Sequence, residues 1–212
     1  MTTQNKRDRL IDSAATLFHT NGLTATSLAD IAKHAEIPIG NVYYYFKTKE
    51  ELAVAAVAKR KEQFSAAYAL LEESIPDPRQ RLIEALRYFE KVADEYTRFG
   101  CPIGKIIVDA DIEKDHVVQT AAQVLEEFVS WAERQFKSLG HGDDAKRYAT
   151  SLMAGIQGAA IMAKATKNAK VMTDEIARLA QWVETLPNRK IQLGKVASQS
   201  SNNSSSDVSN AA

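Results

Sequence analysis

The chain has 212 residues, of which 45% are hydrophobic, and its 27 basic and 27 acidic side chains give a formal net charge of zero. This length allows one large domain, or a small domain joined to a larger one. The zero net charge excludes a chain that is basic throughout, as a general nucleic-acid coat would be. Only 9 Gly and 5 Pro are present, which favours long helices over strands linked by many turns. We therefore expect an all-α protein.

The charge is distributed unevenly along the chain. Residues 1–61 contain nine basic and six acidic side chains, a local charge of +3 that the remainder balances with −3. This asymmetry permits an anionic partner near the amino terminus without proving one.

Cysteine content and hydrophobic runs indicate the compartment. Cys101 is the single cysteine, which excludes an internal disulfide and a multi-cysteine zinc site and fits a reducing cytoplasm. The start, MTTQNKRDRL, lacks the apolar stretch of a signal peptide. The uncharged run between Arg147 and Lys164 falls short of the ~20 apolar residues that a membrane span requires. We expect a soluble, cytoplasmic protein without a membrane partner.

The first 50 residues predict three short helices. Apolar residues at helical spacing mark a first helix over residues 6–20, and Asn21-Gly22 supplies a left-handed stop. Thr26 or Ser27 caps a second helix, with Asp30 completing a capping box with Ser27. Pro38 ends that helix and opens a third, which runs to about Tyr45.

The rest of the chain predicts longer helices and a polar tail. Thr48 and Glu51 form a second capping box, which starts a long helix toward Leu71. Asp77 and Pro78 then open a series of periodic helices, while the Ser- and Asn-rich end has too little apolar material to fold. The predicted units are a DNA-binding domain at residues 1–48, an effector-binding and dimerisation domain at 49–190, and a disordered tail at 191–212.

The segment from Phe18 to Leu52 carries the most specific motif, FHTNGLTATSLADIAKHAEIPIGNVYYYFKTKEEL. Along its full length it resembles the DNA-binding signature of the TetR family of transcriptional regulators. The resemblance implies an amino-terminal helix-turn-helix, a homodimer on palindromic double-stranded operator DNA, and repression relieved by a small-molecule effector, without a cofactor. Its second motif helix would enter the major groove.

The resemblance and the residue types together predict the DNA contacts. Gly40 permits close approach of the backbone to DNA, Asn41 can pair with an adenine edge, and Tyr43 and Tyr44 offer phenolic donors to phosphates. Tyr45 and Phe46 are expected in the core instead. The predicted DNA-contacting residues are Thr26, Ser27, Ile39, Gly40, Asn41, Tyr43, Tyr44 and Lys49.

One part of the motif departs from the family pattern. The family often has a small polar and a basic residue where Pro38 and Ile39 stand. Polar contacts are lost at these positions, and Ile39 would touch a thymine methyl group or simply pack.

A TetR-like effector domain implies a cavity lined by apolar and aromatic side chains with a few polar anchors. Inward helical phase and local sequence select the candidates, although a periodic aromatic residue is more often core than pocket. Four small residues, Ala154, Gly155, Gly158 and Ala159, permit either close helix approach at a dimer interface or room for a ligand. The predicted ligand-binding residues are Phe89, Tyr96, Cys101, Phe128, Trp131, Met153 and Gln157.

The stretch from Phe99 to Gly104 looks like the Gly-Cys sequence at a similar place in two TetR-family branches. These are the LmrA and YxaF type multidrug-linked repressors and the NemR type repressors of electrophile-detoxifying genes, in which the cysteine is a redox sensor. Cys101 is thus either a sensor thiol near a helix start or a small buried residue in a tight turn.

Other functions are possible from the sequence alone. An enzyme is disfavoured because the four histidines form no i, i+4 pair and no nucleophile has an evident base nearby. A ligand-independent DNA-binding factor and a transcriptional activator share the same motif, and the sequence does not separate them from a repressor.

Overall fold

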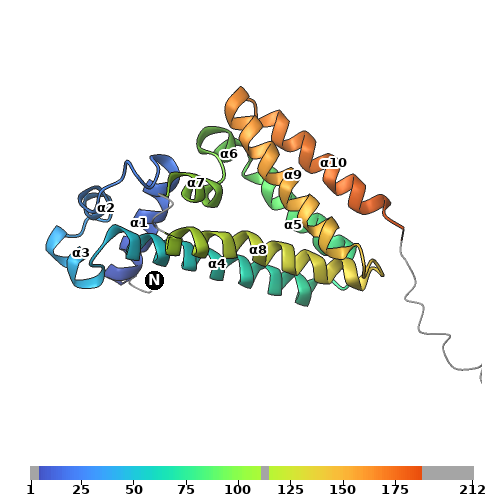
Figure 1. Ribbon diagram of the computed structural model, residues 1–212, viewed down its shortest axis with the longest axis horizontal. Coiled ribbons are helices and arrows are strands. Elements are labelled where there is room, and N and C mark those ends of the chain that lie inside the picture. The colour runs from blue at the N-terminus through green and yellow to red at the C-terminus, as the bar shows by residue number, and fades with distance from the viewer. Residues whose placement is uncertain (1–4, 111–114, 188–212) are drawn as a thin grey trace, which may run out of the picture.

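The computed structural model describes residues 5–110 and 115–187, and helices are the only regular secondary structure in these residues (Figure 1). The all-α prediction is confirmed. The predicted tail at 191–212 lies outside the described residues. The helices are α1 (Lys6–Thr20), α2 (Leu28–His34), α3 (Ile39–Tyr45), α4 (Lys49–Ser74), α5 (Pro78–Lys91), α6 (Ala93–Phe99), α7 (Pro102–Asp109), α8 (Asp115–Ser138), α9 (Ala145–Thr166) and α10 (Ala169–Thr185).

Helices α1 to α3 pack together at one end of the molecule, and we call them the three-helix unit (Figure 1). Their inward positions are apolar and fully buried, as at Leu10, Phe18, Ile31 and Val42. Removing such side chains from water is the main stabilising contribution to a unit of this size. The periodicity of the sequence therefore identified this core.

Local capping chemistry fixes where α2 begins. The Ser27 hydroxyl accepts a hydrogen bond from the Asp30 amide N–H at 3.1 Å, and the Asp30 carboxylate accepts from the Ser27 N–H at 2.9 Å. This reciprocal pair is the predicted capping box. Two hydrogen bonds from Ser27 lower the pKa of Asp30, which keeps the carboxylate charged at the positive end of the helix.

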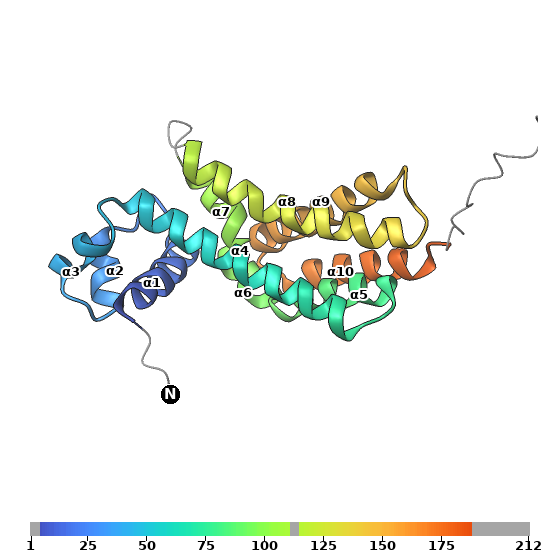
Figure 2. The same cartoon turned by 90° about the horizontal axis from the view of Figure 1, so that it is seen from below.

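Helix α4 runs from the three-helix unit along the remaining helices, which together we call the body (Figure 2). At its start the Thr48 hydroxyl accepts from the Glu51 amide N–H at 3.1 Å. The Glu51 carboxylate accepts from the Lys47 N–H rather than from the cap residue itself, so the predicted box is shifted by one residue. Within the described residues, no helix is long and apolar enough to cross a membrane.

Two predicted boundaries were wrong in detail. The apolar repeat from Leu82 to Tyr96 has the spacing of one continuous helix, but the chain turns at Val92, where α5 ends and α6 begins. Pro38 was expected inside the third helix and instead caps it, with Ile39 as its first residue. Periodicity reports which face is buried and locates helix ends to within one or two residues only.

Candidate nucleic-acid interface and effector pockets

The outer face of α3 is open to solvent and carries apolar and phenolic groups. Ile39 is 43% exposed, Tyr43 50% and Tyr44 76%, whereas Val42 on the opposite face is fully buried. A Cβ added at Gly40 would meet no atom within 4 Å, so this side of the helix is unobstructed. Large apolar and aromatic side chains left in water cost free energy. This face is therefore suited to contact with a partner, such as a groove of DNA.

Tyr45 and Phe46 turn toward the unit rather than away from it. Phe46 is 4% exposed, and the Arg7 guanidinium lies 5.3 Å from the centre of its ring. Tyr45 is half-buried and meets the Tyr44 ring edge to face, with centroids 4.9 Å apart. The prediction that Tyr45 and Phe46 belong to the core agrees with this placement.

Ser27, Thr26 and Lys49, which were predicted to contact DNA, differ in exposure and in their hydrogen bonds. Ser27 is exposed, and its side chain forms the α2 cap. Thr26 is only 2% exposed and donates its hydroxyl hydrogen to the Gly22 carbonyl at 2.7 Å. The Lys49 ammonium group donates to the Leu23 carbonyl at 2.8 Å. Thr26 and Lys49 therefore hold the turn between α1 and α2.

Lys47, which was not among the predicted contact residues, follows the aromatic run of α3. Its side chain is exposed, and its ammonium group donates to the Tyr43 carbonyl at 2.6 Å, at the end of α3. A cation at a helix C-terminus is favourable, and here it also places positive charge beside the exposed tyrosines. Its position directly after the aromatic run was the available signal.

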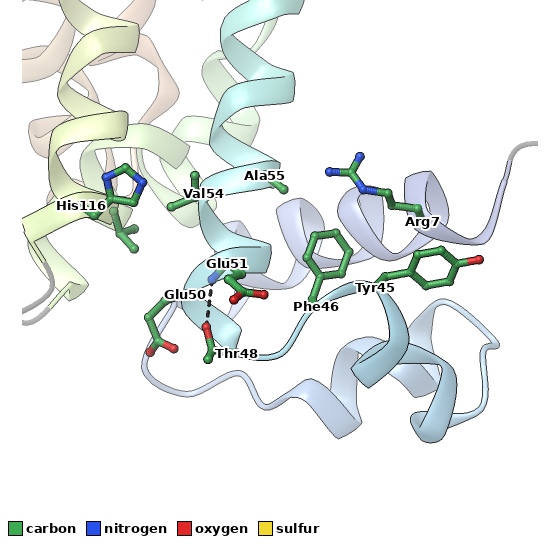
Figure 3. A pocket seen from close by; sticks show the side chains of 10 residues that line it. Arg7, Tyr45, Phe46, Thr48, Glu50, Glu51, Val54, Ala55 and His116 are labelled. Carbon is green, nitrogen blue, oxygen red and sulfur yellow. Dashed lines mark hydrogen bonds between the residues drawn. The ribbon is translucent and has the colours of Figure 1, made fainter.

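A hollow of about 660 Å³ lies where the three-helix unit meets the body (Figure 3). It collects side chains from α1, the end of α3, the start of α4 and the start of α8, including Arg7, Phe46, Glu50 and His116. Charges of both signs stand beside aromatic rings, and the hollow is open to solvent. On this side the two parts of the molecule are not packed tightly together.

On the other side, α7 ties the body to α1 by polar contacts. The Lys105 ammonium group donates to the carbonyls of His19 and Thr20 at 3.1 and 3.2 Å. The Asp109 carboxylate accepts from the Leu23 N–H at 3.3 Å, and a Cβ at Gly22 would lie 2.5 Å from it. Gly22 has φ +100°, so both its conformation and this close approach require glycine.

His19 adds a second contact between the two parts. Its ring is 6% exposed, with Nε2 2.8 Å from the Gly100 carbonyl oxygen and Nδ1 3.1 Å from a Glu95 carboxylate oxygen. The end of α1 is therefore held against both α6 and the turn before α7.

The aromatic candidates of the body form one buried cluster. Phe128 and Trp131 are each 1% exposed, and Phe128 meets the rings of Phe89 and Trp131 with centroids 6.1 and 6.2 Å apart. Among the predicted aromatic ligand residues, Phe89 lines a pocket of about 320 Å³ between α4 and α5. Burial raises the pKa of Tyr96 well above its usual value.

A different pocket, of about 550 Å³, lies between α7 and α9 and includes Cys101 and Gln157. We call it the α7–α9 pocket. Cys101 is 8% exposed and caps α7, its sulfur accepting from the Gly104 N–H at 3.4 Å. The Gln157 amide donates to the sulfur of Met153, which is itself 9% exposed, at 3.5 Å. Of the predicted ligand residues, Cys101 and Gln157 therefore line this pocket, and Met153 is joined to it through Gln157.

Two family models match the two parts of the chain. Residues 10–56 match "Bacterial regulatory proteins, tetR family", and residues 79–178 match "Transcriptional regulator LmrA/YxaF-like, C-terminal domain". The chain belongs to the TetR family of transcriptional regulators. Of the two effector-domain branches expected from the Gly-Cys stretch, the carboxy-terminal model corresponds to the LmrA and YxaF type.

Known relatives of this TetR-family protein agree with the models. It is 26% identical over 173 residues to the HTH-type transcriptional regulator LmrA of Bacillus subtilis, covering 77% of this chain and 89% of LmrA. It is 28% identical over 117 residues to the HTH-type transcriptional repressor NemR of Escherichia coli, covering 53% and 55%. A TetR transcriptional regulator from Legionella pneumophila has the same fold, with a TM-score of 0.77, 16% identity, and 86% and 99% coverage.

Proposed function

We propose that this TetR-family protein is a ligand-responsive repressor that binds a palindromic operator as a homodimer. The exposed face of α3, with Gly40 unobstructed and Tyr43 and Tyr44 in solvent, is the observation that carries this proposal. An α-helix fits the major groove of DNA, where base edges can be read by side chains such as Asn41. Arg, Lys and phenolic groups then position the helix on phosphates.

The outer surface of α9 and α10 is the proposed dimer interface. Met162 on α9 is 52% exposed, which is unusual for a large apolar side chain unless a partner covers it. Gly158 is exposed with open space around it, whereas a Cβ at Gly155 would lie 2.9 Å from Glu175 on α10 of the same chain. Gly155 therefore serves packing within the chain, and Gly158 permits close approach of a second copy.

Ligand response requires that the body and the DNA-binding face be coupled. The contacts of Lys105, Asp109 and His19 join α6 and α7 directly to α1 and the following turn. Effector binding in the body releases DNA if it favours an arrangement in which the two recognition helices no longer match successive major grooves.

Operator binding by the purified protein tests the proposal. The DNA is selected from random sequence, and binding is measured with and without a thiol-reactive electrophile for the wild type and Cys101→Ser. We expect tight binding to a palindrome by a dimer. Release by the electrophile in the wild type alone would make Cys101 the sensor, whereas indifference of both proteins would make Cys101 structural.

The direction of regulation needs a separate measurement. A reporter under the selected operator is expected to rise when the gene for this protein is deleted. A fall in reporter output on deletion would contradict repression and establish activation. Binding without sequence preference, or by a monomer, would contradict the operator proposal itself.

A further inference from the structure

The α7–α9 pocket has an apolar side that is open to solvent. Val108 on α7 is 83% exposed and Ile161 on α9 is 68% exposed, and both line the pocket together with the buried Ala160. At about 550 Å³ the space is within the usual range for small-molecule sites. An apolar ligand group lying here would remove both side chains from water, which favours binding.

The same pocket has two ammonium groups on its rim. Lys105 and Lys164 both line it, and in residues 5–110 and 115–187 neither takes part in a salt bridge. Each donates instead to the last carbonyls of a helix: Lys105 to the end of α1, and Lys164 to Phe99 of α6 at 3.0 Å. The Asp109 carboxylate also lines the pocket, so the two ammonium groups leave a net positive charge beside the apolar wall, which is complementary to an anion.

The electrostatics of Lys105 support this complementarity. Burial, together with repulsion from Lys164, lowers the pKa of Lys105. An anion placed between the two ammonium groups would offset that repulsion and stabilise both charges. Charge-assisted hydrogen bonds to a carboxylate are also stronger than hydrogen bonds to a neutral carbonyl.

From this arrangement we infer that the α7–α9 pocket binds a small amphipathic carboxylate. The apolar body of the ligand lies against Val108 and Ile161, the carboxylate accepts from Lys105 and Lys164, and the Gln157 amide lies at the pocket wall. The regulatory consequence of this site rests on the proposed repressor function, but binding of the carboxylate does not.

The site gives a direct route from ligand to DNA-binding face. Lys105 joins the pocket to the end of α1, because its ammonium group donates to the carbonyls of His19 and Thr20. When that group turns to a ligand carboxylate, the body loses two hydrogen bonds to the three-helix unit. The unit then moves more freely relative to the body, and the spacing of the two α3 helices in a dimer is no longer fixed.

Titration calorimetry of the full chain with three matched probes tests the inference. The probes are 4-phenylbutyrate, its neutral amide and 4-phenylbutylamine, which share an apolar body and differ in charge. We expect the carboxylate to bind at least about tenfold more tightly than the amide, as expected for charge-assisted hydrogen bonds, and the amine to bind most weakly. Equal affinity for the three probes, or no binding of the carboxylate, would overturn the inference.

Two variants locate the binding in this pocket. Lys164→Gln removes one ammonium group at an exposed position, and Val108→Glu adds a repelling charge at a side chain that is 83% exposed, so both should fold. Each is expected to weaken 4-phenylbutyrate binding about tenfold or more. Lys146→Gln makes the same change as the first variant at the exposed start of α9 and should bind like the wild type. Unchanged affinity in both pocket variants, or an equal loss in the control, would overturn the site.

Operator DNA separates this inference from the proposed function. Calorimetry without DNA reads carboxylate binding alone, and operator release by 4-phenylbutyrate reads the coupling. Carboxylate binding by a protein that recognises no operator would leave the site standing and remove the repressor proposal. If the protein binds an operator but binds none of the three probes, the repressor proposal stands and the carboxylate site is overturned.

Discussion

Aromatic residues lie in both parts of this molecule, the three-helix unit and the body, and serve different purposes. Tyr43 and Tyr44 on α3 are 50% and 76% exposed, whereas Phe128 and Trp131 on α8 are each 1% exposed and in ring contact with their neighbours. The residue type is similar, and the surroundings decide its function. Exposed phenols on a short helix are available to a partner, while rings enclosed by other rings chiefly stabilise the fold.

The largest expected effect comes from the buried aromatic residues of the body. Phe128→Ala deletes a ring that is packed against Phe89, Tyr68 and Trp131, and it leaves a cavity. We expect a loss of about 3–5 kcal/mol in the free energy of unfolding, measured by urea denaturation at fixed protein concentration.

Tyr44→Ala is the matched control for that change. It removes an aromatic ring of similar size from an exposed position and should change stability by no more than about 0.5 kcal/mol. If Phe128→Ala cost as little as Tyr44→Ala, Phe128 would line a space for ligand, as the sequence alone allowed, rather than the core.

The next largest effect concerns the proposed recognition of a DNA base by α3. Asn41→Ala removes the side chain best suited to an adenine edge and is expected to cost about 1–3 kcal/mol of discrimination at one operator position. Binding to a series of single-base operator variants measures it. An equal loss on every variant would show that Asn41 contacts phosphate or supports α3 instead of reading a base.

The contrast between exposed and buried residues also explains how much of the α3 face could be predicted from the sequence. The exposed face of α3 was predictable because Gly40, Asn41, Tyr43 and Tyr44 lie in one short helix whose period is local. Its contact with DNA stays a prediction. Thr26 was misjudged because its neighbour Ser27 took the capping position, and the Thr26 hydroxyl turned inward to Gly22.

The α7–α9 pocket was only partly predictable. Cys101 and Gln157 were candidates, but Lys164 is distant in sequence from Lys105, and only the packing of α6 against α9 and of α7 against α8 brings the two charges to one rim. No local sequence pattern predicts that residues so far apart in the chain lie close together. The aromatic residues of the body were predicted as ligand contacts because they lie on the inward face of their helices. Core and pocket residues both lie on that face, so periodicity does not separate them.

A smaller effect is expected at the capping box that begins α2, the helix packed against α3. Ser27→Ala removes the side-chain oxygen that accepts from the Asp30 N–H, and about 1 kcal/mol of stability should be lost at neutral pH. The pKa of Asp30 is lowered in the folded protein, so its contribution is present above its ordinary value of 3.8 and is lost as the pH falls through the folded value.

The cost of Ser27→Ala should therefore shrink in acid. Urea denaturation at pH 7 and at pH values below 3.8 measures this dependence. A cost that is the same at both would show that the charge of Asp30 does not contribute to the cap.

The smallest expected effect distinguishes the phenol from its ring. Tyr43→Phe keeps the ring at a half-exposed position and removes one hydroxyl donor, so stability should not change, while operator affinity falls by about 0.5–1.5 kcal/mol. Because a phosphate contact carries no base information, the loss should be the same on every operator variant, in contrast to Asn41→Ala. A loss confined to one base position would assign Tyr43 to base reading. No loss at all would mean that its ring, and not its hydroxyl, meets the DNA, as the exposed apolar Ile39 on the same face would also do.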